Sequence, residues 1–270
     1  MIIIRLAGGL GNQIFQFVAG VYCAKKINCR KIILDDSSLN NYDVKRENEL
    51  LKFFDLSKLN IEVRFKNILI TNFRLPKLLP LNIPNYPLVS DRNFQAILKN
   101  PNKIFMLLDG YFQECLIQED FNKEIEILKS ILINNDKIKE KNGCVIHIRG
   151  GDFVKLGWNS VTPQEYYYNA IEKMKKDYHQ KDFYIVTDDK NYSKTILDRL
   201  DIDYTFIGNS MYEDFYLIGS FKYRILSSST FALWASALGD NEDSIVIAPN
   251  EWIPKHYRRI YLPNEIRIDF

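Results

Sequence analysis

The segment 147–152, with the sequence HIRGGD, directly follows the short apolar run 144–146. Such a run predicts a buried β-strand, which places the polar segment where the strand leaves its sheet. Open α/β sheets bind ligands at the carboxyl ends of their strands, and paired glycines let the backbone approach a ligand closely. The planar fork of the Arg149 guanidinium matches the oxygens of a phosphate group. The segment therefore predicts a site for a phosphorylated ligand, and a β-turn with a surface arginine is the alternative.

A glycine-rich loop, 8–13 (GGLGNQ), lies between the predicted strand 1–6 and the predicted helix 12–27. Free amides and the helix dipole make such a loop suitable for binding an anion. The loop also resembles the start of a dinucleotide-binding fingerprint, with Asp35 at the end of the next predicted strand. Ile14 stands where that fingerprint has its third glycine, and a bulky side chain there opposes close packing of helix on strand. NAD binding is therefore the lesser alternative at this loop.

Two further segments place polar groups at predicted strand ends in the second half of the chain. Asp188 follows the predicted strand 182–187 and can accept hydrogen bonds from a base or a ribose, whereas Asp189 suits the N-cap of the next helix. The segment 227–231 (SSSTF) presents hydroxyls and amides at another helix start. Together with Arg149, these groups predict a phosphate-binding site at three strand ends of one sheet.

The elements that must position these groups alternate along the chain. In the first half we expect strands at 1–6, 31–35 and 103–109 and helices at 12–27 and 118–134, with a proline-rich, loop-rich stretch between them. In the second half we expect strands at 143–148, 182–187, 204–208, 223–227 and 244–248 and helices at 163–178, 190–200, 211–221 and 230–239. Strands separated by helices of this length indicate parallel, doubly wound sheets. We therefore predict two α/β domains facing each other across a cleft, joined by the polar stretch 134–142.

Helix-capping signals support this division into elements. Thr162 and Glu165 have the spacing of a capping box before the predicted helix 163–178. Ser210 has the same relation to Glu213 before the next helix but one, and Gly239 is a typical helix stop.

Composition and charge exclude several classes of protein. A net charge of +2 argues against a nucleic-acid-binding protein, which normally shows a strong basic excess. No stretch approaches the ~20 apolar residues of a membrane-spanning helix, so we expect a cytoplasmic protein. The four cysteines have no metal-type spacing and are expected to be reduced thiols. A basic, aromatic-rich cluster near the C-terminus is expected to be a solvated face that can touch anionic lipid headgroups; its members are Lys255, His256, Arg258 and Arg259.

Taken together, the motifs resemble the bacterial α-1,2-fucosyltransferases of glycosyltransferase family 11. That family has a G-G-x-G-N-Q loop, an H-x-R-R-x-D box and an S-D-D strand end. The matching segments here are 8–13 (GGLGNQ), 110–113 (GYFQ), 147–152 (HIRGGD), 187–189 (TDD), 213–218 (EDFYLI) and 228–235 (SSTFALWA). They follow the family order over nearly the whole chain.

The resemblance implies an α/β fold of the GT-B-like type, with two Rossmann-type domains facing across a cleft. It implies an acceptor-side domain at 1–138 and a nucleotide-sugar-binding domain at 139–270. The implied donor is GDP-fucose, with inversion at the sugar and no metal or other cofactor. The implied acceptor is a galactose-containing glycan hydroxyl, O2 of a galactoside, in a surface glycan or lipid-linked oligosaccharide. Apart from the resemblance, the basic cluster near the C-terminus is the reason to expect peripheral contact with the inner face of the membrane, and the low net charge is the reason to expect no nucleic-acid partner.

By the same resemblance, Arg149 holds the diphosphate and stabilises charge on the departing GDP. His147 and Asp188 face the guanosine end, and Asn12 reaches the diphosphate or the fucose from the first domain. The implied donor-binding set is Gly9, Gly11, Asn12, His147, Arg149, Asp188, Ser228, Ser229, Thr230 and Phe231.

Gly150 departs from the family box, because the second arginine of H-x-R-R-x-D is absent. Losing one charge-assisted contact costs about 1.5–3 kcal/mol unless another cation, such as Lys155, replaces it. The alternatives that follow are transfer of another nucleotide-linked sugar, or a catalytically silent nucleotide-sugar-binding protein. The implied catalytic residues are Arg149 and Asp152. Asp152 is the carboxylate nearest to the box that can take the acceptor's proton, although it can equally order the loop, and the leaving phosphate is an alternative base.

Overall fold

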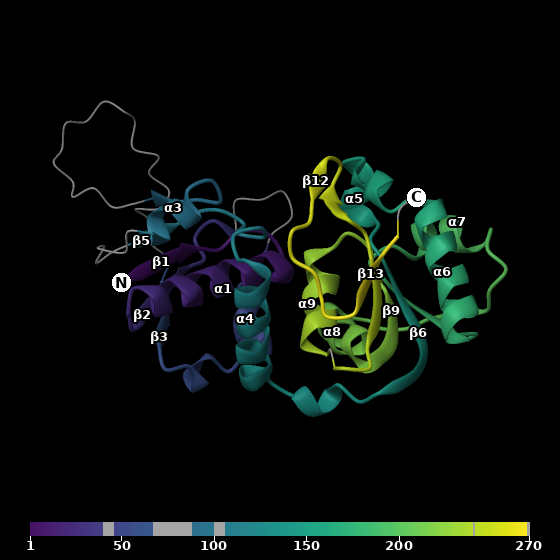
Figure 1. Ribbon diagram of the computed structural model, residues 1–270, viewed down its shortest axis with the longest axis horizontal. Helices are drawn as coiled ribbons and strands as arrows, with labels where there is room; N and C mark the ends of the chain where they lie inside the picture. The colour runs from purple at the N-terminus through teal and green to yellow at the C-terminus, as the bar shows by residue number, and fades with distance from the viewer. Residues whose placement is uncertain (40–45, 67–87, 100–105, 240, 269–270) are drawn as a thin grey trace. The chain divides into compact units, whose positions relative to one another are not determined.

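The computed structural model describes residues 1–270 except 40–45, 67–87, 100–105, 240 and 269–270. The described chain forms two compact units, Met1–Ile133 and Asn134–Phe270, each built around a parallel β-sheet (Figure 1). The sequence placed the division at 138/139, and the acceptor-side and donor-side assignments of the two halves stay predictions. Of the predicted linker, Asn135–Lys137 forms a 3-10 turn, and the first strand of the second unit begins at Lys141.

The first unit has five parallel strands in the order β3-β2-β1-β5-β4. Its elements are β1 (Ile2–Arg5), α1 (Leu10–Lys26), β2 (Lys31–Asp35), α2 (Leu50–Phe53), η2 (Leu56–Lys58), β3 (Glu62–Phe65), β4 (Leu88–Val89), α3 (Phe94–Leu98), β5 (Met106–Leu108) and α4 (Gln118–Ile131). The apolar runs of β1 and β2 are buried, as strands covered on both faces require. The predicted strand 103–109 is confirmed from Met106; its first residues lie outside the described ranges.

Helix α1 packs closely on the strand that precedes it. Gly20 makes this possible, because a Cβ atom there would lie 2.0 Å from the Cδ1 atom of Ile4. On its other side α1 contacts α4, where the rings of Phe15 and Phe121 stack with their centroids 6.3 Å apart. The glycine-rich loop is thereby fixed between a buried strand and a buried helix.

The second unit has six parallel strands in the order β13-β10-β9-β6-β7-β8. Its elements are η4 (Asn135–Lys137), β6 (Lys141–Ile148), α5 (Gly151–Lys155), η5 (Trp158–Val161), α6 (Gln164–Tyr178), β7 (Phe183–Thr187), α7 (Lys190–Leu197), β8 (Tyr204–Phe206), α8 (Met211–Ser220), β9 (Phe221–Ile225), α9 (Thr230–Leu238), β10 (Ile245–Ala248), β11 (Glu251–Ile253), β12 (His256–Tyr257) and β13 (Glu265–Arg267). Helices α6 and α7 cover one face of the sheet, and α8 and α9 cover the other (Figure 1). The predicted doubly wound α/β fold is thus confirmed.

Three of the four capping predictions hold and one is wrong. Asp189 caps α7, since its side chain accepts a hydrogen bond from the Tyr192 amide. Ser210 caps α8, since its hydroxyl accepts a hydrogen bond from the Glu213 amide, and Gly239 forms the C-cap of α9. The N-cap of α6, however, is Pro163, with no side-chain cap. Thr162 is buried and hydrogen-bonds the Tyr167 hydroxyl instead, so the capping-box spacing there has another use.

The predicted solvated basic cluster near the C-terminus is also partly wrong. Arg258 is buried and forms an ion pair of 2.8 Å with Glu265, whose side chain is equally buried. The Arg258 guanidinium also packs over the Trp252 ring, 5.2 Å from its centroid. Arg258 therefore ties the chain after β12 to β13, and only the other three members of the cluster are exposed.

Candidate functional site

The sheet of the second unit has a topological switch point at the carboxyl end of β6. From β6 the chain moves to β7 and then β8 on one side, and it returns to β9 on the other side of β6. In open α/β sheets ligands bind in the crevice where the strand order reverses. The residues that follow β6 and β9 therefore flank the expected binding crevice.

A hydrogen bond joins the two sides of this switch point. His147 Nδ1 lies 2.8 Å from the Ser227 hydroxyl oxygen, and both residues are buried. Burial, with a smaller contribution from the Arg149 charge, lowers the pKa of His147 to about 3. His147 is therefore a neutral hydrogen-bonding group at physiological pH and a weak proton acceptor, which suits ligand positioning.

Arg149 follows the end of β6 and is held by two carboxylates. Its Nη2 atom lies 2.6 Å from Asp152 of α5, and its Nη1 atom lies 2.6 Å from Asp188, which follows β7. Asp188 also accepts a hydrogen bond of 2.8 Å from the Gly150 amide. The guanidinium packs against the Phe153 ring, 5.8 Å from its centroid. The structure thus brings three of the predicted site residues, Arg149, Asp152 and Asp188, into direct contact.

Gly150 has no room for a side chain in this arrangement. A Cβ atom there would lie 2.5 Å from Asp189 Cβ and 3.2 Å from the Tyr192 ring. Asp189 is fixed in place because it caps α7, accepting a hydrogen bond of 3.0 Å from the Tyr192 amide. The segment that follows β7 therefore packs closely against Gly150, at the position where the family box has its second arginine. Lys155, its suggested substitute, lies exposed at the end of α5.

The predicted phosphate loop between β9 and α9 is tightly braced. The Ser228 hydroxyl donates to the Glu251 carbonyl at 2.7 Å and also contacts the Trp252 carbonyl. The Ser229 hydroxyl caps α9 by accepting from the Ala232 amide. Both hydroxyls and the Ala232 amide are thus engaged with the protein. The groups suited to an anion here are the α9 amides that precede Ala232, beginning at Thr230. The Phe231 ring lies against that of His147, with centroids 6.2 Å apart.

The first unit has its own switch point, between β1 and β5. Asn12, in the first turn of α1, accepts a hydrogen bond of 3.0 Å from Gln113, which follows β5. A Cβ atom at Gly8, whose φ is 74°, would lie 2.5 Å from the Asn12 amide nitrogen. Gly9 is the N-cap of α1 and Gly11 lies in its first turn, so the predicted first-unit residues lie together. Gln113 was not among the predicted site residues, although its segment is one of those that resemble the family.

Two buried glutamines hold the glycine-rich loop in shape. Gln13 donates to the carbonyls of Gly8 and Glu47, at 3.1 and 2.8 Å. Gln16 accepts from the Ala7 amide and donates to the Gly110 carbonyl, both at 3.0 Å. Their amides satisfy backbone groups at both sides of the switch point, which gives the loop a fixed conformation.

One carboxylate that the sequence did not single out has an unusual environment. Burial, with additional effects of Glu213 and Asp188, raises the pKa of Asp214 to about 6. Asp214 lies in the first turn of α8 against Gly208, where a Cβ atom would be 1.9 Å from its carboxylate oxygen. Its segment was recognised by resemblance, but neither its burial nor its contact with Gly208 has a signal in the sequence.

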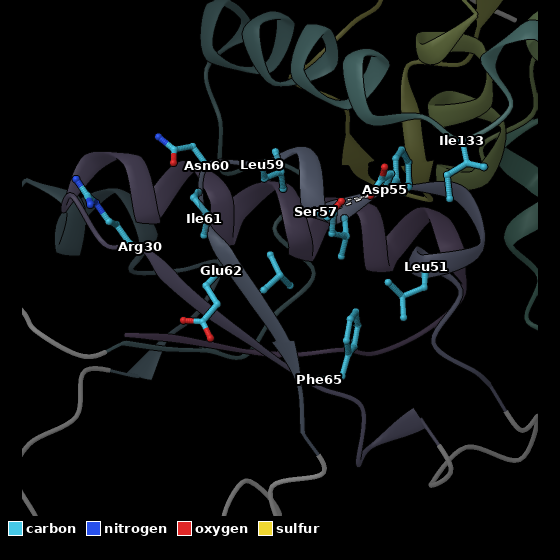
Figure 2. Close-up of a pocket in the computed structure, with 13 residues that line it drawn as sticks. Arg30, Leu51, Asp55, Ser57, Leu59, Asn60, Ile61, Glu62, Phe65 and Ile133 are labelled. Atoms are coloured by element: carbon cyan, nitrogen blue, oxygen red, sulfur yellow. Dashed lines mark hydrogen bonds between the residues drawn. The ribbon is translucent and has the colours of Figure 1, made fainter.

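The first unit also has a groove (Figure 2). It has a volume of about 1020 Å³ and runs beside the edge strand β3. Its lining includes Leu51, Phe54, Ile61 and Phe65, and none of the predicted site residues contributes to it.

The described residues also bear on metal binding, membrane crossing and disulfide formation. No group of three or more His, Cys, Asp or Glu side chains there is arranged to hold a metal ion. None of the described helices is both long enough and apolar enough to cross a membrane. All four cysteines lie in the described ranges and are free thiols.

Comparison with known proteins agrees with this geometry. The chain is similar to an α-1,2-colitosyltransferase of Escherichia coli, with 29% identity over 94% of this chain and 93% of the relative. It is also similar to the O-antigen biosynthesis glycosyltransferase WbnK of Escherichia coli, with 28% identity over 92% of this chain and 93% of that protein. Among solved structures, the fucosyltransferase NodZ from Bradyrhizobium superposes with a TM-score of 0.54 at 14% identity. That match covers 87% of this chain and 91% of NodZ, which confirms the predicted GT-B-like fold.

The family itself is established by its sequence profile. The profile described as Glycosyl transferase family 11 matches residues 1–268, which is nearly the whole chain. The protein therefore belongs to glycosyl transferase family 11.

Proposed function

We propose that this glycosyltransferase moves L-fucose from GDP-fucose to O2 of a galactoside in a surface glycan or lipid-linked oligosaccharide, with inversion and without a metal ion. The observation that carries the proposal is the arrangement at the β6 switch point, where Arg149 follows β6 and the α9 amides follow β9. A fixed cation beside a helix N-terminus is suited to a diphosphate. Related solved structures support the donor, because one is a NodZ α-1,6-fucosyltransferase soaked with GDP-fucose.

The reaction requires stabilisation of charge on the leaving group. The acceptor oxygen forms a bond to C1 of the sugar while the bond from C1 to the β-phosphate oxygen breaks, so GDP departs with that electron pair. In this proposal Arg149 and the first-turn amides of α9 stabilise this negative charge, and no metal cation is required. Asp152 is the proposed acceptor of the hydroxyl proton, and neutral His147 positions the donor through hydrogen bonds.

A second donor deserves a direct test, because one relative is an α-1,2-colitosyltransferase. The two donors differ in their sugar, whereas the diphosphate that Arg149 is proposed to bind is common to both. The diphosphate contacts therefore do not distinguish the two sugars, and the choice must be measured. The predicted cytoplasmic location and membrane contact likewise stay proposals, and the exposed Lys255, His256 and Arg259 support the membrane contact.

The decisive experiment measures transfer with GDP-fucose and a galactoside acceptor, in EDTA, with the linkage of the product determined by NMR. We expect an α-1,2-linked fucoside and release of GDP. Arg149→Ala should reduce kcat by about 100-fold or more, because a preorganised charge-stabilising donor is lost. Arg199→Ala, an exposed arginine after α7, is the matched control and should retain full activity. Transfer from the colitose nucleotide but not from GDP-fucose would change the assigned donor sugar. Full activity of Arg149→Ala would refute the proposed mechanism.

A further inference from the structure

Two short segments expose apolar side chains at the carboxyl end of the second unit's sheet. The first is the end of α5, where Val154 is 38% exposed and Leu156 is 57% exposed. The second is the β11–β12 hairpin, where Tyr257 is 67% exposed. Both segments follow the carboxyl ends of parallel strands, β6 and β10, and η5 contacts both α5 and β11. Figure 1 shows α5 and β12 at the same end of this unit, so the three side chains belong to one surface.

Positive charge accompanies these apolar side chains. Lys155 is exposed at the end of α5, Lys255 is exposed at the turn of the hairpin, and Arg259 is exposed just after β12. The Glu251 carboxylate on the same hairpin is engaged within it, since it accepts from the Lys255 amide at 2.9 Å and contacts the Tyr257 hydroxyl. Cations beside exposed aliphatic and aromatic side chains are complementary to anionic headgroups above an acyl interior, and tyrosine is enriched at that boundary.

The same two segments contact the residues of the proposed donor site. The Ser228 hydroxyl donates to the Glu251 carbonyl at 2.7 Å, which ties the hairpin to the loop before α9. Helix α5 begins directly after Gly150, and its Asp152 pairs with Arg149. A partner that binds this surface is therefore held beside the carboxyl end of the sheet, where the donor is proposed to bind.

We propose that the end of α5 and the β11–β12 hairpin form a docking surface for an anionic phospholipid bilayer. In this arrangement the cations meet the headgroups, while Leu156 and Tyr257 enter the boundary between headgroups and acyl chains. A lipid-linked acceptor is confined to the same bilayer, so docking raises its effective concentration at the donor site. That consequence for the acceptor rests on the function proposed above, whereas bilayer binding itself does not.

Sedimentation with sucrose-loaded vesicles measures the docking. The unmodified protein should bind vesicles of phosphatidylglycerol mixed with phosphatidylcholine, and binding should fall at high salt because the charges are screened. Lys155→Gln with Lys255→Gln should weaken binding about 20- to 30-fold, since each cation near an anionic surface contributes about 5-fold. Leu156→Gln with Tyr257→Gln should weaken it about 10-fold or more, because two apolar side chains no longer enter the lipid.

Tyr168→Gln with Lys176→Gln is the matched control, because it changes one aromatic side chain and one cation at exposed positions of α6. This control should bind vesicles as the unmodified protein does. Equal binding by the control and by both surface variants would overturn the proposal, because another part of the molecule would then hold the vesicles. The same holds if the unmodified protein does not bind, or if it self-associates through this surface instead, since a second copy would then cover it.

Transfer to a soluble galactoside separates this proposal from the proposed function. Leu156→Gln with Tyr257→Gln should retain transfer from GDP-fucose to the soluble acceptor, whereas its KM for a lipid-linked acceptor in vesicles should rise. If vesicle binding responds to the variants as expected but no fucose is transferred, the docking surface stands and the proposed function fails. If soluble transfer occurs but the unmodified protein does not bind vesicles, the function stands and the docking surface fails.

Discussion

At the residue scale, Gly150 is where this chain departs from the H-x-R-R-x-D box of the family that its motifs resemble. The sequence alone indicates a lost charge at the donor site. The structure adds that the Cβ position is closed by Asp189, whose own place is fixed by the α7 cap. The absence of the second arginine therefore goes with the close packing of Asp189 at this position. A side chain introduced at position 150 should not improve nucleotide binding.

Gly150→Ala tests this directly. The added methyl group would lie 2.5 Å from Asp189 Cβ, so the 149–151 backbone must shift. We expect a loss of about 1–3 kcal/mol in the free energy of unfolding, as for other overpacked sites, together with weaker GDP binding. Gly157→Ala is a suitable control for added bulk alone, since nothing lies within 4 Å of its Cβ position, although its φ of 71° adds some strain of its own. Denaturant titrations and calorimetry measure both effects, and a Gly150→Ala protein with unchanged stability and affinity would contradict the packing argument.

At the scale of elements, the sequence predicted the strands and helices that bear the site because their apolar periodicity is strong. The strand before Arg149, the helix after Asp189 and the helix after Ser229 lie where the patterns placed them. What periodicity could not predict were the short elements, α5 and the β11–β12 hairpin, because their form depends on distant contacts. The hairpin, for example, is held to the site by the Ser228 hydroxyl. The pairing of Arg149 with Asp188 likewise requires β6 and β7 to be neighbours, which no local pattern states.

Arg224 is the clearest case of an element organised by tertiary contacts. It lies buried in β9, and its guanidinium donates to carbonyl oxygens at the C-terminal ends of α8 and α9, including Gly219 at 3.0 Å and Gly239 at 2.8 Å. These carbonyls have no partners within their own helices, so the guanidinium satisfies them. Arg224→Met should cost about 3–5 kcal/mol in the free energy of unfolding, because several buried acceptors lose their donor. Lys222→Met on the same strand should cost less than about 1 kcal/mol, and equal losses in denaturant titrations would contradict this role.

At the scale of the whole molecule, the residues proposed to hold the nucleotide belong mainly to the second unit, whereas the glycine-rich loop belongs to the first. A ligand stabilises the folded unit to which it binds, so the unit that GDP stabilises is the one that carries the nucleotide site. GDP at about 100 times its Kd should add about 2.7 kcal/mol, which corresponds to a rise in Tm of roughly 5 °C for a chain of this size.

Hydrogen exchange with and without GDP can then localise the effect. We expect GDP to add protection at 147–152 and 227–231, since both segments follow strands at the β6 switch point. This protection should persist in EDTA, because the proposed site uses Arg149 and helix amides instead of a metal cation. UDP, which shares the diphosphate but not the base, should protect the same segments more weakly. NAD tests the alternative function of the glycine-rich loop. If NAD protects only 8–13 and GDP protects no segment, the loop is a dinucleotide-binding site. Loss of the GDP effect in EDTA would instead require a metal ion in a site that is proposed to work without one.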